Sequence, residues 1–302
     1  MGGSFSWFMT RKLVALAVTV VLAPTVVWTV FNGLRGTGGQ PLYDVAADYV
    51  VATYWHFDLG TSPAYYGGKV SSVVAYTLPA DVALVVGGIT AGLVMGTAAG
   101  VACIAWPRSM TSRALQFAGA FVLSTPPYWL GFMVLLFFAP GTGYILEVPF
   151  VSGLMDYRDA THDFLGWLKA LWVPWILVGL PLAAGVMRMT VITLRDTAGE
   201  DFVRTARAKG VRGRRVLIRH SLPLAIAPVA ALVGASMPLL ITNIALVESA
   251  FNIPGLYREI RSVYSTADLP LIQAMVIETT ILIVVANTAA DLIQARVDPR
   301  VR

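Results

Sequence analysis

Long stretches that almost lack charged residues are the feature that most constrains this chain. Each stretch holds about 20 residues, which is enough to cross ~30 Å of hydrocarbon as a helix rising 1.5 Å per residue. They cover residues 13–31, 82–105, 114–138, 166–187, 228–248 and 270–292. We therefore predict an all-α, polytopic membrane protein with six transmembrane helices, and a single transmembrane domain over residues 1–302.

The composition excludes an ordinary water-soluble protein. Apolar residues make up 57% of the chain and charged residues 13%, whereas about a quarter of a soluble chain is charged. The first apolar run follows Arg11 and Lys12, as the core of a signal peptide would. That run is longer than the ~7–15 residues of a signal-peptide core, and no clear Ala-x-Ala site follows it. We expect it to be a retained helix.

The distribution of cations predicts the orientation. With the N-terminus in the cytoplasm, sixteen of the 22 Lys and Arg residues fall in cytoplasmic segments, as the positive-inside rule requires. This bias explains the net charge of +5 without nucleic acid. We predict cytoplasmic N- and C-termini, outer (periplasmic) loops at 33–76 and 139–165, and a cytoplasmic loop at 188–227. In the first outer loop, four aromatic residues predict a short interfacial helix: Tyr43, Tyr49, Tyr54 and Trp55.

The sequence contains no motif for catalysis or metal binding. Cys103 is the single cysteine, and the three histidines are far apart, so neither a disulfide framework nor a metal-ligand spacing is present. Gly68-Lys69 is followed by Val70 and is not a phosphate-binding loop. We also find no Gly-x-Ser-x-Gly, no His-Glu-x-x-His and no suitable pair of intramembrane aspartates, which argues against an intramembrane protease. We expect no catalytic residue, no metal and no bound cofactor in this chain.

The cytoplasmic loop concentrates positive charge in a segment with helix signals. Thr197 and Glu200 have the spacing of a capping box. Acidic residues then open a predicted helix at 200–210, Arg207 and Lys209 close it, and Gly210 is a suitable left-handed stop. A solvated basic loop would account for the charge, and a capped helix with a narrow Ala/Gly face also suits a partner's groove. The spacing leaves both interpretations open.

The residues EDFVRTARAKG at 200–210 resemble the cytoplasmic loop of the dipeptide/oligopeptide permease family of bacterial ABC importers. The general loop motif of such permeases is Glu-Ala-Ala, three residues, Gly, nine residues, Ile, one residue and Leu-Pro. Four of its positions are met, at Ala206, Gly210, Leu222 and Pro223. Three are replaced, at Arg204, Thr205 and His220. The peptide-permease variant, Tyr-Val-Arg-Thr-Ala-Arg-Ala-Lys-Gly, fits more closely, with Phe202 in place of Tyr.

The resemblance extends over roughly residues 57–302. Further segments resemble the family at 57–79, 124–138, 245–260, 268–277 and 291–302. The first 56 residues depart from it. Where the family often has Pro-Gly-Asp-Pro after its first span, this chain reads NGLRGTGGQPLYD at 32–44.

The resemblance implies a multi-pass permease subunit of an ATP-driven importer in the bacterial inner (plasma) membrane. It would form half of a translocation pathway for di- or oligopeptides, together with a second permease subunit of the same family. Two ABC ATPase subunits would hold ATP and Mg, and an extracytoplasmic binding protein would deliver substrate. Similar permeases carry nickel or short oligosaccharides, so the substrate stays open. The implied ATPase-coupling residues are Glu200, Asp201, Phe202, Arg204, Thr205, Ala206, Arg207, Ala208, Lys209, Gly210, Leu222 and Pro223.

A few prolines and polar residues within the spans are candidates for the pathway or for the permease interface. They are Pro126, Pro127, Asn243, Glu248 and Glu278. A charge at the bilayer centre costs about 2.5–3.5 kcal/mol on insertion scales, so such residues usually face protein or a water-filled cavity. A buried pair or a neutral acid accounts for Glu278 equally well, and the two prolines make either a gate hinge or a static kink. Asp81 and Glu248 lie near span ends and are expected at the membrane interface.

The alternative function is a secondary transporter or channel with six spans that needs no ATPase. Such a protein also has a few intramembrane acids and no ATP-binding motif. It leaves the ordered helix of the cytoplasmic loop without a purpose, so we favour the importer subunit.

Overall fold

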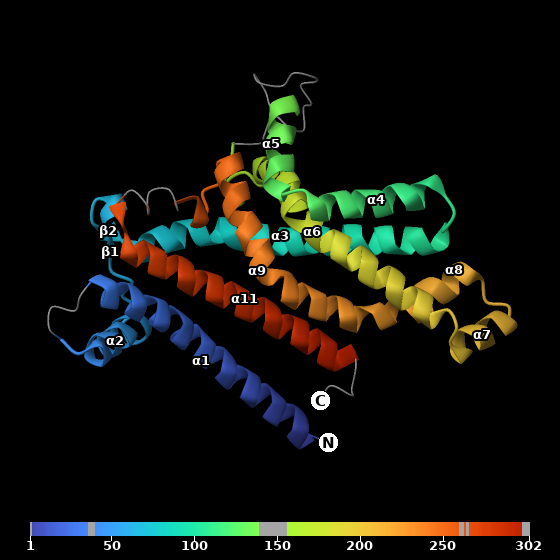
Figure 1. Cartoon of the computed structure of the whole chain (residues 1–302), viewed down its shortest axis with the longest axis horizontal. Coiled ribbons are helices and arrows are strands. Elements are labelled where there is room, and N and C mark those ends of the chain that lie inside the picture. Colours follow the sequence, from blue (N-terminus) through green and yellow to red (C-terminus); the bar gives the residue numbers. More distant parts are fainter. Residues whose placement is uncertain (1, 36–39, 139–155, 260–262, 264–265, 298–302) are drawn as a thin grey trace. The chain divides into compact units, whose positions relative to one another are not determined.

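The computed structural model describes residues 2–35, 40–138, 156–259, 263 and 266–297. Helices dominate it (Figure 1). The long helices are α1 (Gly2–Arg35), α3 (Val70–Ala105), α6 (Phe164–Thr197), α9 (Ile226–Phe251) and α11 (Leu269–Val297). The shorter ones are α2 (Leu42–Val50), α4 (Met110–Ser124), α5 (Pro127–Phe138), α7 (Asp201–Ala208) and α8 (Gly213–Val216). The segments 139–155 and 298–302, which belong to the predicted outer loop and C-terminal tail, lie outside the described residues.

Within that description, five helices are long and apolar enough to cross a membrane, and α4 and α5 together make a sixth if the pair is one span. The all-α polytopic fold is therefore confirmed. The predicted helix over 114–138 is not straight, because α4 and α5 meet at an angle of 105°. Thr125, before Pro126, has an extended backbone with φ −116° and ψ 131°. Proline disfavours the helical conformation of the residue that precedes it, which explains the break.

Several helices run past the predicted span boundaries. α6 continues from the predicted end at residue 187 to Thr197, so the segment predicted as a cytoplasmic loop begins with a helical extension. The other end of the predicted loop is also helical, with a π-helical turn at Leu217–Ser221 and a 3-10 turn at Leu222–Ala225 leading into α9. A helix that is already nucleated gains one hydrogen bond for each residue it adds, and no glycine or proline lies between Met187 and Gly199.

The described chain divides into two compact units. The first comprises residues 1–82 and 254–288, and the second comprises residues 83–253 and 289–301. In the first unit α1 packs against α2, with the rings of Trp28 and Tyr49 stacked at 4.7 Å. The hydroxyl of Tyr54 donates to the Val20 carbonyl at 2.8 Å. The helix predicted from the outer aromatic residues is thus present as α2 and the π-helical turn Val51–Trp55 that continues it.

One buried carboxylate organises the rest of the first unit. The strands β1 (Thr61–Ser62) and β2 (Gly68–Lys69) form a small antiparallel hairpin before α3. Asp268, which is fully buried, accepts hydrogen bonds from the Ser62 hydroxyl and from the Ala64 amide, the latter at 3.1 Å. Its other oxygen accepts from the Leu271 amide at 3.0 Å and so caps α11. An apolar cluster that includes Leu256, Leu271 and Met275 lies within the same unit.

The second unit is built around α6. In the apolar 18-residue window of α6, 67% of the residues are buried, whereas 6% are buried in that of α1. α6 packs against α4, α5 and α9. α3 approaches α6 through glycines spaced four residues apart, at Gly88, Gly92, Gly96 and Gly100. A Cβ on Gly96 would lie 2.5 Å from the Ala183 carbonyl oxygen and 2.6 Å from Val186 Cβ. The two backbones are therefore in contact, as small residues at every fourth position permit.

Candidate functional site

The segment predicted to dock on a partner contains a short helix, α7, with defined ends. Asp201 lies in its first turn, where an anion is favoured by the helix dipole. The Glu200 carbonyl accepts the first hydrogen bonds, from the amides of Val203 at 3.0 Å and Arg204 at 3.2 Å. Glu200 therefore flanks the helix, and the helix predicted at 200–210 is present with slightly narrower bounds.

The predicted stop at Gly210 is confirmed. Gly210 has a left-handed backbone with φ +77°. The amide of Val211 donates to the Ala206 carbonyl at 3.1 Å, which is the six-to-one hydrogen bond of a Schellman ending. A side chain at Gly210 would be strained, because other residues pay for a positive φ.

The predicted capping box is wrong. Thr197 is the last residue of α6, and its hydroxyl donates to the Thr193 carbonyl at 2.8 Å instead of accepting from the helix that follows. The spacing from Thr197 to Glu200 is right for a cap, but α6 extends far enough to take Thr197 into its own last turn. A hydroxyl inside a helix commonly bonds to the carbonyl four residues earlier.

The two faces of α7 differ in exposure. Val203 is 1% exposed and anchors the helix, whereas its neighbour Phe202 is 41% exposed. The exposed residues of the predicted coupling set are Glu200, Asp201, Phe202, Arg204, Thr205, Ala208, Lys209 and Gly210. Ala206 is half-buried, and the side chain of Arg207 is not among those that the structure describes. The ion pair of Arg204 and Asp201, 4.0 Å apart and mostly exposed, adds little stability. α7 thus presents an apolar ring among charges.

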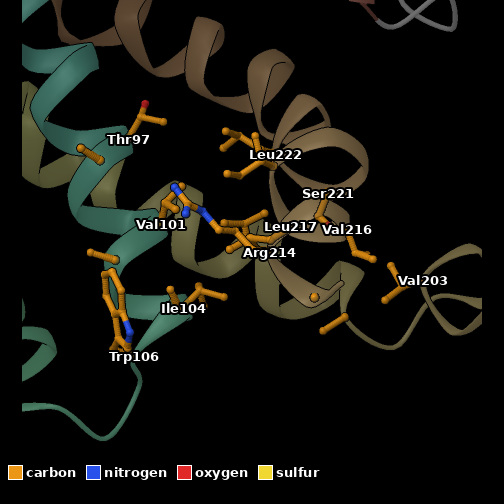
Figure 2. A pocket seen from close by; sticks show the side chains of 17 residues that line it. Thr97, Val101, Ile104, Trp106, Val203, Arg214, Val216, Leu217, Ser221 and Leu222 are labelled. Carbon is orange, nitrogen blue, oxygen red and sulfur yellow. The ribbon is translucent and has the colours of Figure 1, made fainter. Parts of the chain in front are cut away.

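The Leu222-Pro223 pair of the predicted motif lies in the 3-10 turn that precedes α9. Leu222 is half-buried and Pro223 is exposed. Leu222 and Val203 line the same groove of about 840 Å³, whose other walls come from the ends of α3 and α6 (Figure 2). The groove therefore connects the inner face of α7 with the start of α9.

Three of the predicted pathway residues meet in one pocket. Pro126, Pro127 and Asn243 line a pocket of about 320 Å³ between the α4–α5 break, α6 and α9. Asn243 is 4% exposed, and its amide nitrogen finds no acceptor in the described part of the chain. A buried donor without a partner costs about 1–3 kcal/mol. The pocket therefore offers a buried amide donor to a polar solute.

The two acids predicted for the pathway are buried. Glu248 on α9 is 0% exposed and Glu278 on α11 is 4% exposed. Glu278 has no donor within reach in the described residues and faces the carboxyl group of Asp81 in the same unit. Asp81 is also fully buried and accepts the Leu256 amide at 3.0 Å. Asp81 and Glu248 are thus enclosed by protein, while their expected position at the membrane interface and the pathway role of Glu248 and Glu278 stay predictions.

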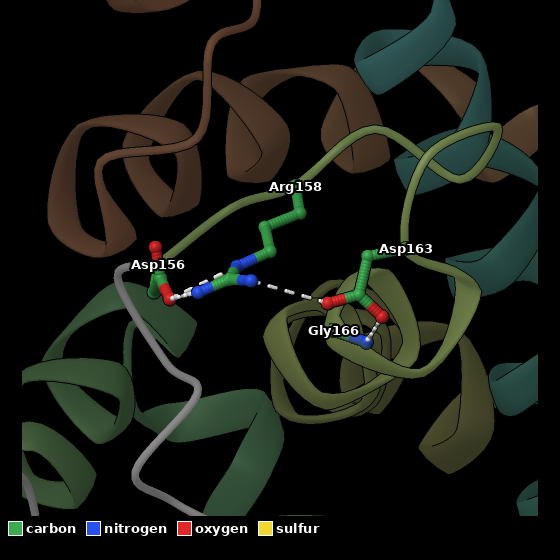
Figure 3. Close-up of polar contacts among 4 residues, drawn as sticks. All are labelled: Asp156, Arg158, Asp163 and Gly166. Atoms are coloured by element: carbon green, nitrogen blue, oxygen red, sulfur yellow. Dashed lines mark hydrogen bonds and ion pairs between the residues drawn. The ribbon is translucent and has the colours of Figure 1, made fainter.

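The segment before α6 carries an exposed charge cluster (Figure 3). Arg158 forms ion pairs with Asp156 at 3.0 Å and with Asp163 at 3.3 Å. Both contacts raise the pKa of Arg158, and the contact with Asp156 has the larger effect. Asp163 also accepts the Gly166 amide at 2.9 Å and caps α6. Hydrogen bonds from the amide and hydroxyl of Thr161 lower the pKa of Asp159. The cluster fixes the start of α6.

No group of three or more His, Cys, Asp or Glu residues that could hold a metal ion occurs in the described part of the chain.

Sequence reasoning missed three features that shape this site. The glycine repeat of α3 is visible in the sequence as Gly-x-x-x-Gly. The buried anchor Val203 and the groove-lining Arg214 carry no local signal, because both depend on how α7 and α8 fold back.

Comparison with known proteins places these features in a family. Residues 88–302 match the family described as binding-protein-dependent transport system inner membrane component. The chain is 29% identical to the oligopeptide transport system permease protein AppB of Bacillus subtilis, over 81% of this chain and 76% of that protein. It is 30% identical to the dipeptide permease DppB of Haemophilus influenzae, over 70% and 66%. It is 32% identical to the oligopeptide permease OppB of Mycobacterium bovis, over 71% and 68%.

Proposed function

The chain belongs to the family of binding-protein-dependent transport system inner membrane components, and we propose that it forms half of the pathway of an ATP-driven peptide importer. It is a multi-pass permease subunit of the inner membrane, and its family is not the ATPase subunit. The names of three similar permeases, two for oligopeptide transport and one for dipeptide transport, support a peptide as substrate.

The proposed complex contains four kinds of component. This chain pairs with a second permease of the same family, two ABC ATPase subunits bind ATP and Mg, and an extracytoplasmic binding protein delivers the peptide. The chain itself binds no cofactor in this proposal. Membership in a binding-protein-dependent family supports the presence of an ATPase and a binding protein in general terms.

The observation that carries the coupling proposal is the exposed Phe202 on a helix whose ends are both defined. An apolar ring on a charged surface costs nothing to cover and gains about 25 cal/mol for each Å² removed from water. We propose that α7 inserts this face into a cleft of an ATPase subunit, with Arg204 and Lys209 beside acidic groups of the partner. α6 then transmits the movement, because its contact with α3 leaves no space for the two helices to slide independently.

A matched pair of phenylalanines tests this proposal. Phe202→Ala removes the exposed ring of α7, and Phe117→Ala removes a ring that is 74% exposed on α4. We expect Phe202→Ala to lose ATPase subunits on copurification, or to lose most of the ATPase activity that the loaded binding protein stimulates. Phe117→Ala should keep both. If the two variants behave alike, or if the native chain purifies alone and transports along a proton gradient, the coupling proposal is wrong.

The pocket at the α4–α5 break is our proposed contact for the passing peptide. The Asn243 amide would donate to a peptide carbonyl there, and the bend at Pro126 would shape the wall. We expect Asn243→Leu to lower transport while the ATPase subunits stay bound, because the coupling helix is unchanged. Leu246→Met, a conservative change in the same pocket wall, is the control. Normal transport by Asn243→Leu would remove this residue from the pathway.

The cytoplasmic position of α7 and of both termini is also a proposal, supported by the bias of the cations. Cys103 is buried, so a cysteine introduced elsewhere will report on its own position. We expect Gly199→Cys in intact cells to resist a membrane-impermeant maleimide, and Thr161→Cys to react with it. The reverse pattern would invert the topology.

A further inference from the structure

The groove beneath α8 has a charge that nothing in the described chain neutralises. Thr97, Val101 and Ile104 of α3 form one wall of the groove, and Leu217 and Ile218 form another. Figure 2 shows the side chain of Arg214 reaching across the groove toward Val101. Arg214 makes no ion pair or hydrogen bond within the residues that the structure describes. Arg214 is exposed, so its guanidinium is open to an anion from outside the chain while its stem lies along apolar side chains.

The position of the groove along α3 indicates what this partner is. α3 has 36 residues and is ~54 Å long, which exceeds the ~40–45 Å of a bilayer with its headgroups. The groove follows the last turns of α3, from Thr97 to Ala105, and includes Trp106 directly after the helix. Trp106 is 63% exposed at the end of the helix, a position typical of an interfacial aromatic residue. The groove therefore runs from headgroup level into the hydrocarbon.

We propose that this groove binds an anionic phospholipid. Its phosphate pairs with Arg214 through the planar guanidinium, which suits phosphate oxygens. One acyl chain lies along the wall formed by Thr97, Val101 and Leu222. Basic pockets between membrane helices are suited to anionic headgroups, and three further exposed arginines in the same segment add positive charge: Arg212, Arg215 and Arg219. Val203 of α7 lines the groove, so the lipid would support the position of α7 from beneath.

Charge favours a lipid over a protein segment as the occupant. A peptide in this groove would bury its backbone groups against apolar walls, where they find no partners. A phospholipid brings one anion for one cation and apolar chains for the rest. The proposal requires that α3 and α9 lie in a membrane, and it does not depend on α7 docking to an ATPase.

Two adjacent arginines provide the test. The assembled transporter is reconstituted in nanodiscs of phosphatidylcholine, with or without phosphatidylglycerol, and lipid that stays bound after transfer to detergent is measured by native mass spectrometry. Arg214→Gln should reduce retained phosphatidylglycerol about fivefold, the weight of one cation near an anionic surface. Arg215→Gln, which removes the same charge outside the groove wall, should keep it. Ala98→Phe, which fills the groove without removing charge, should also displace the lipid.

Three results would overturn the proposal. Equal losses in the two arginine variants would mean diffuse attraction by the basic segment. Equal retention of phosphatidylcholine and phosphatidylglycerol would mean that Arg214 selects no headgroup. Unchanged lipid in Arg214→Gln, with loss of the ATPase subunits, would mean that Arg214 pairs with an acid of a protein partner. The lipid readout does not use transport, so it separates this proposal from the peptide-importer proposal.

Discussion

The two compact units hold their helices together by different means. In the second unit α3 meets α6 through a glycine repeat that brings backbone against backbone, with apolar groups around it. In the first unit, beside aromatic and apolar packing, buried carboxyl groups join separate segments, since Asp268 joins the hairpin to α11 and Asp81 holds the Leu256 amide. A membrane gives no hydrophobic driving force for helix association, so close packing and internal hydrogen bonds are the means available.

The difference has consequences for sensitivity. A contact between backbones fails when volume is added and has no titratable group. A contact through carboxylates tolerates some change in volume and fails when its acceptors are removed. The second unit, which carries α7, therefore suits the transmission of a rigid movement.

The largest expected effect follows from adding volume between α3 and α6. Gly96→Leu places a side chain where even a Cβ would lie 2.5 Å from the Ala183 carbonyl oxygen. The helices must separate, and we expect a loss of roughly 3 kcal/mol or more, measured as thermal stability of the purified transporter. Gly199→Leu is the matched control, because no atom lies within 4 Å of the new Cβ there. Equal stability of the two variants would contradict a close contact at Gly96.

Sequence reasoning reached this region only in part. The apolar runs predicted the helices, and the double proline predicted the break at Pro126, because both signals are local. The 105° bend and the position of Asn243 beside it depend on which helices pack together, and no single-chain pattern encodes that. Thr197 was misplaced because a cap and a helix interior offer its hydroxyl competing hydrogen bonds. Asp268 could not be recognised, since its partner Ser62 is 206 residues away in the sequence.

A more local effect, confined to the first unit, is expected from the carboxylate that joins the hairpin to α11. Asp268→Ala leaves the amides of Ala64 and Leu271 and the hydroxyl of Ser62 without their acceptor. Each buried orphan costs about 1–3 kcal/mol, of which water entering from the loop side recovers a part. We expect faster hydrogen exchange at Ala64 and Leu271 and unchanged exchange in α6. Asp268→Asn keeps one acceptor, so its exchange rates should fall between those of the native chain and of Asp268→Ala. Uniform loss of protection in both units would show that they do not fail separately.

Glu278 sharpens the comparison, because it places a second carboxyl group beside a buried one. It faces Asp81, and two acceptors without a proton between them repel. Glu278→Gln supplies an amide donor for Asp81. We expect its free energy of unfolding to equal that of the native chain or to exceed it by up to about 1 kcal/mol. Asp81→Leu removes the acceptor of the Leu256 amide and should be less stable. A Glu278→Gln variant that is stable but inactive in transport would give Glu278 a pathway role, whereas a destabilised one would contradict the repulsion.

The smallest effect is a dependence on pH confined to the first unit. Burial, together with the charge and hydrogen bond of Glu259, raises the pKa of Tyr65 from the usual 10.0 to about 12. Because the neutral phenol is favoured in the folded state, its contribution is complete below about pH 10 and is lost as the pH rises through 12. In an absorbance titration, the tyrosinate that forms near pH 12 in the native chain should be missing from Tyr65→Phe. Glu259→Gln removes the neighbouring charge and should lower this pKa, while leaving the part due to burial. A Tyr65 that ionises at the same pH in Glu259→Gln would assign the whole shift to burial and leave the charge of Glu259 without effect on it.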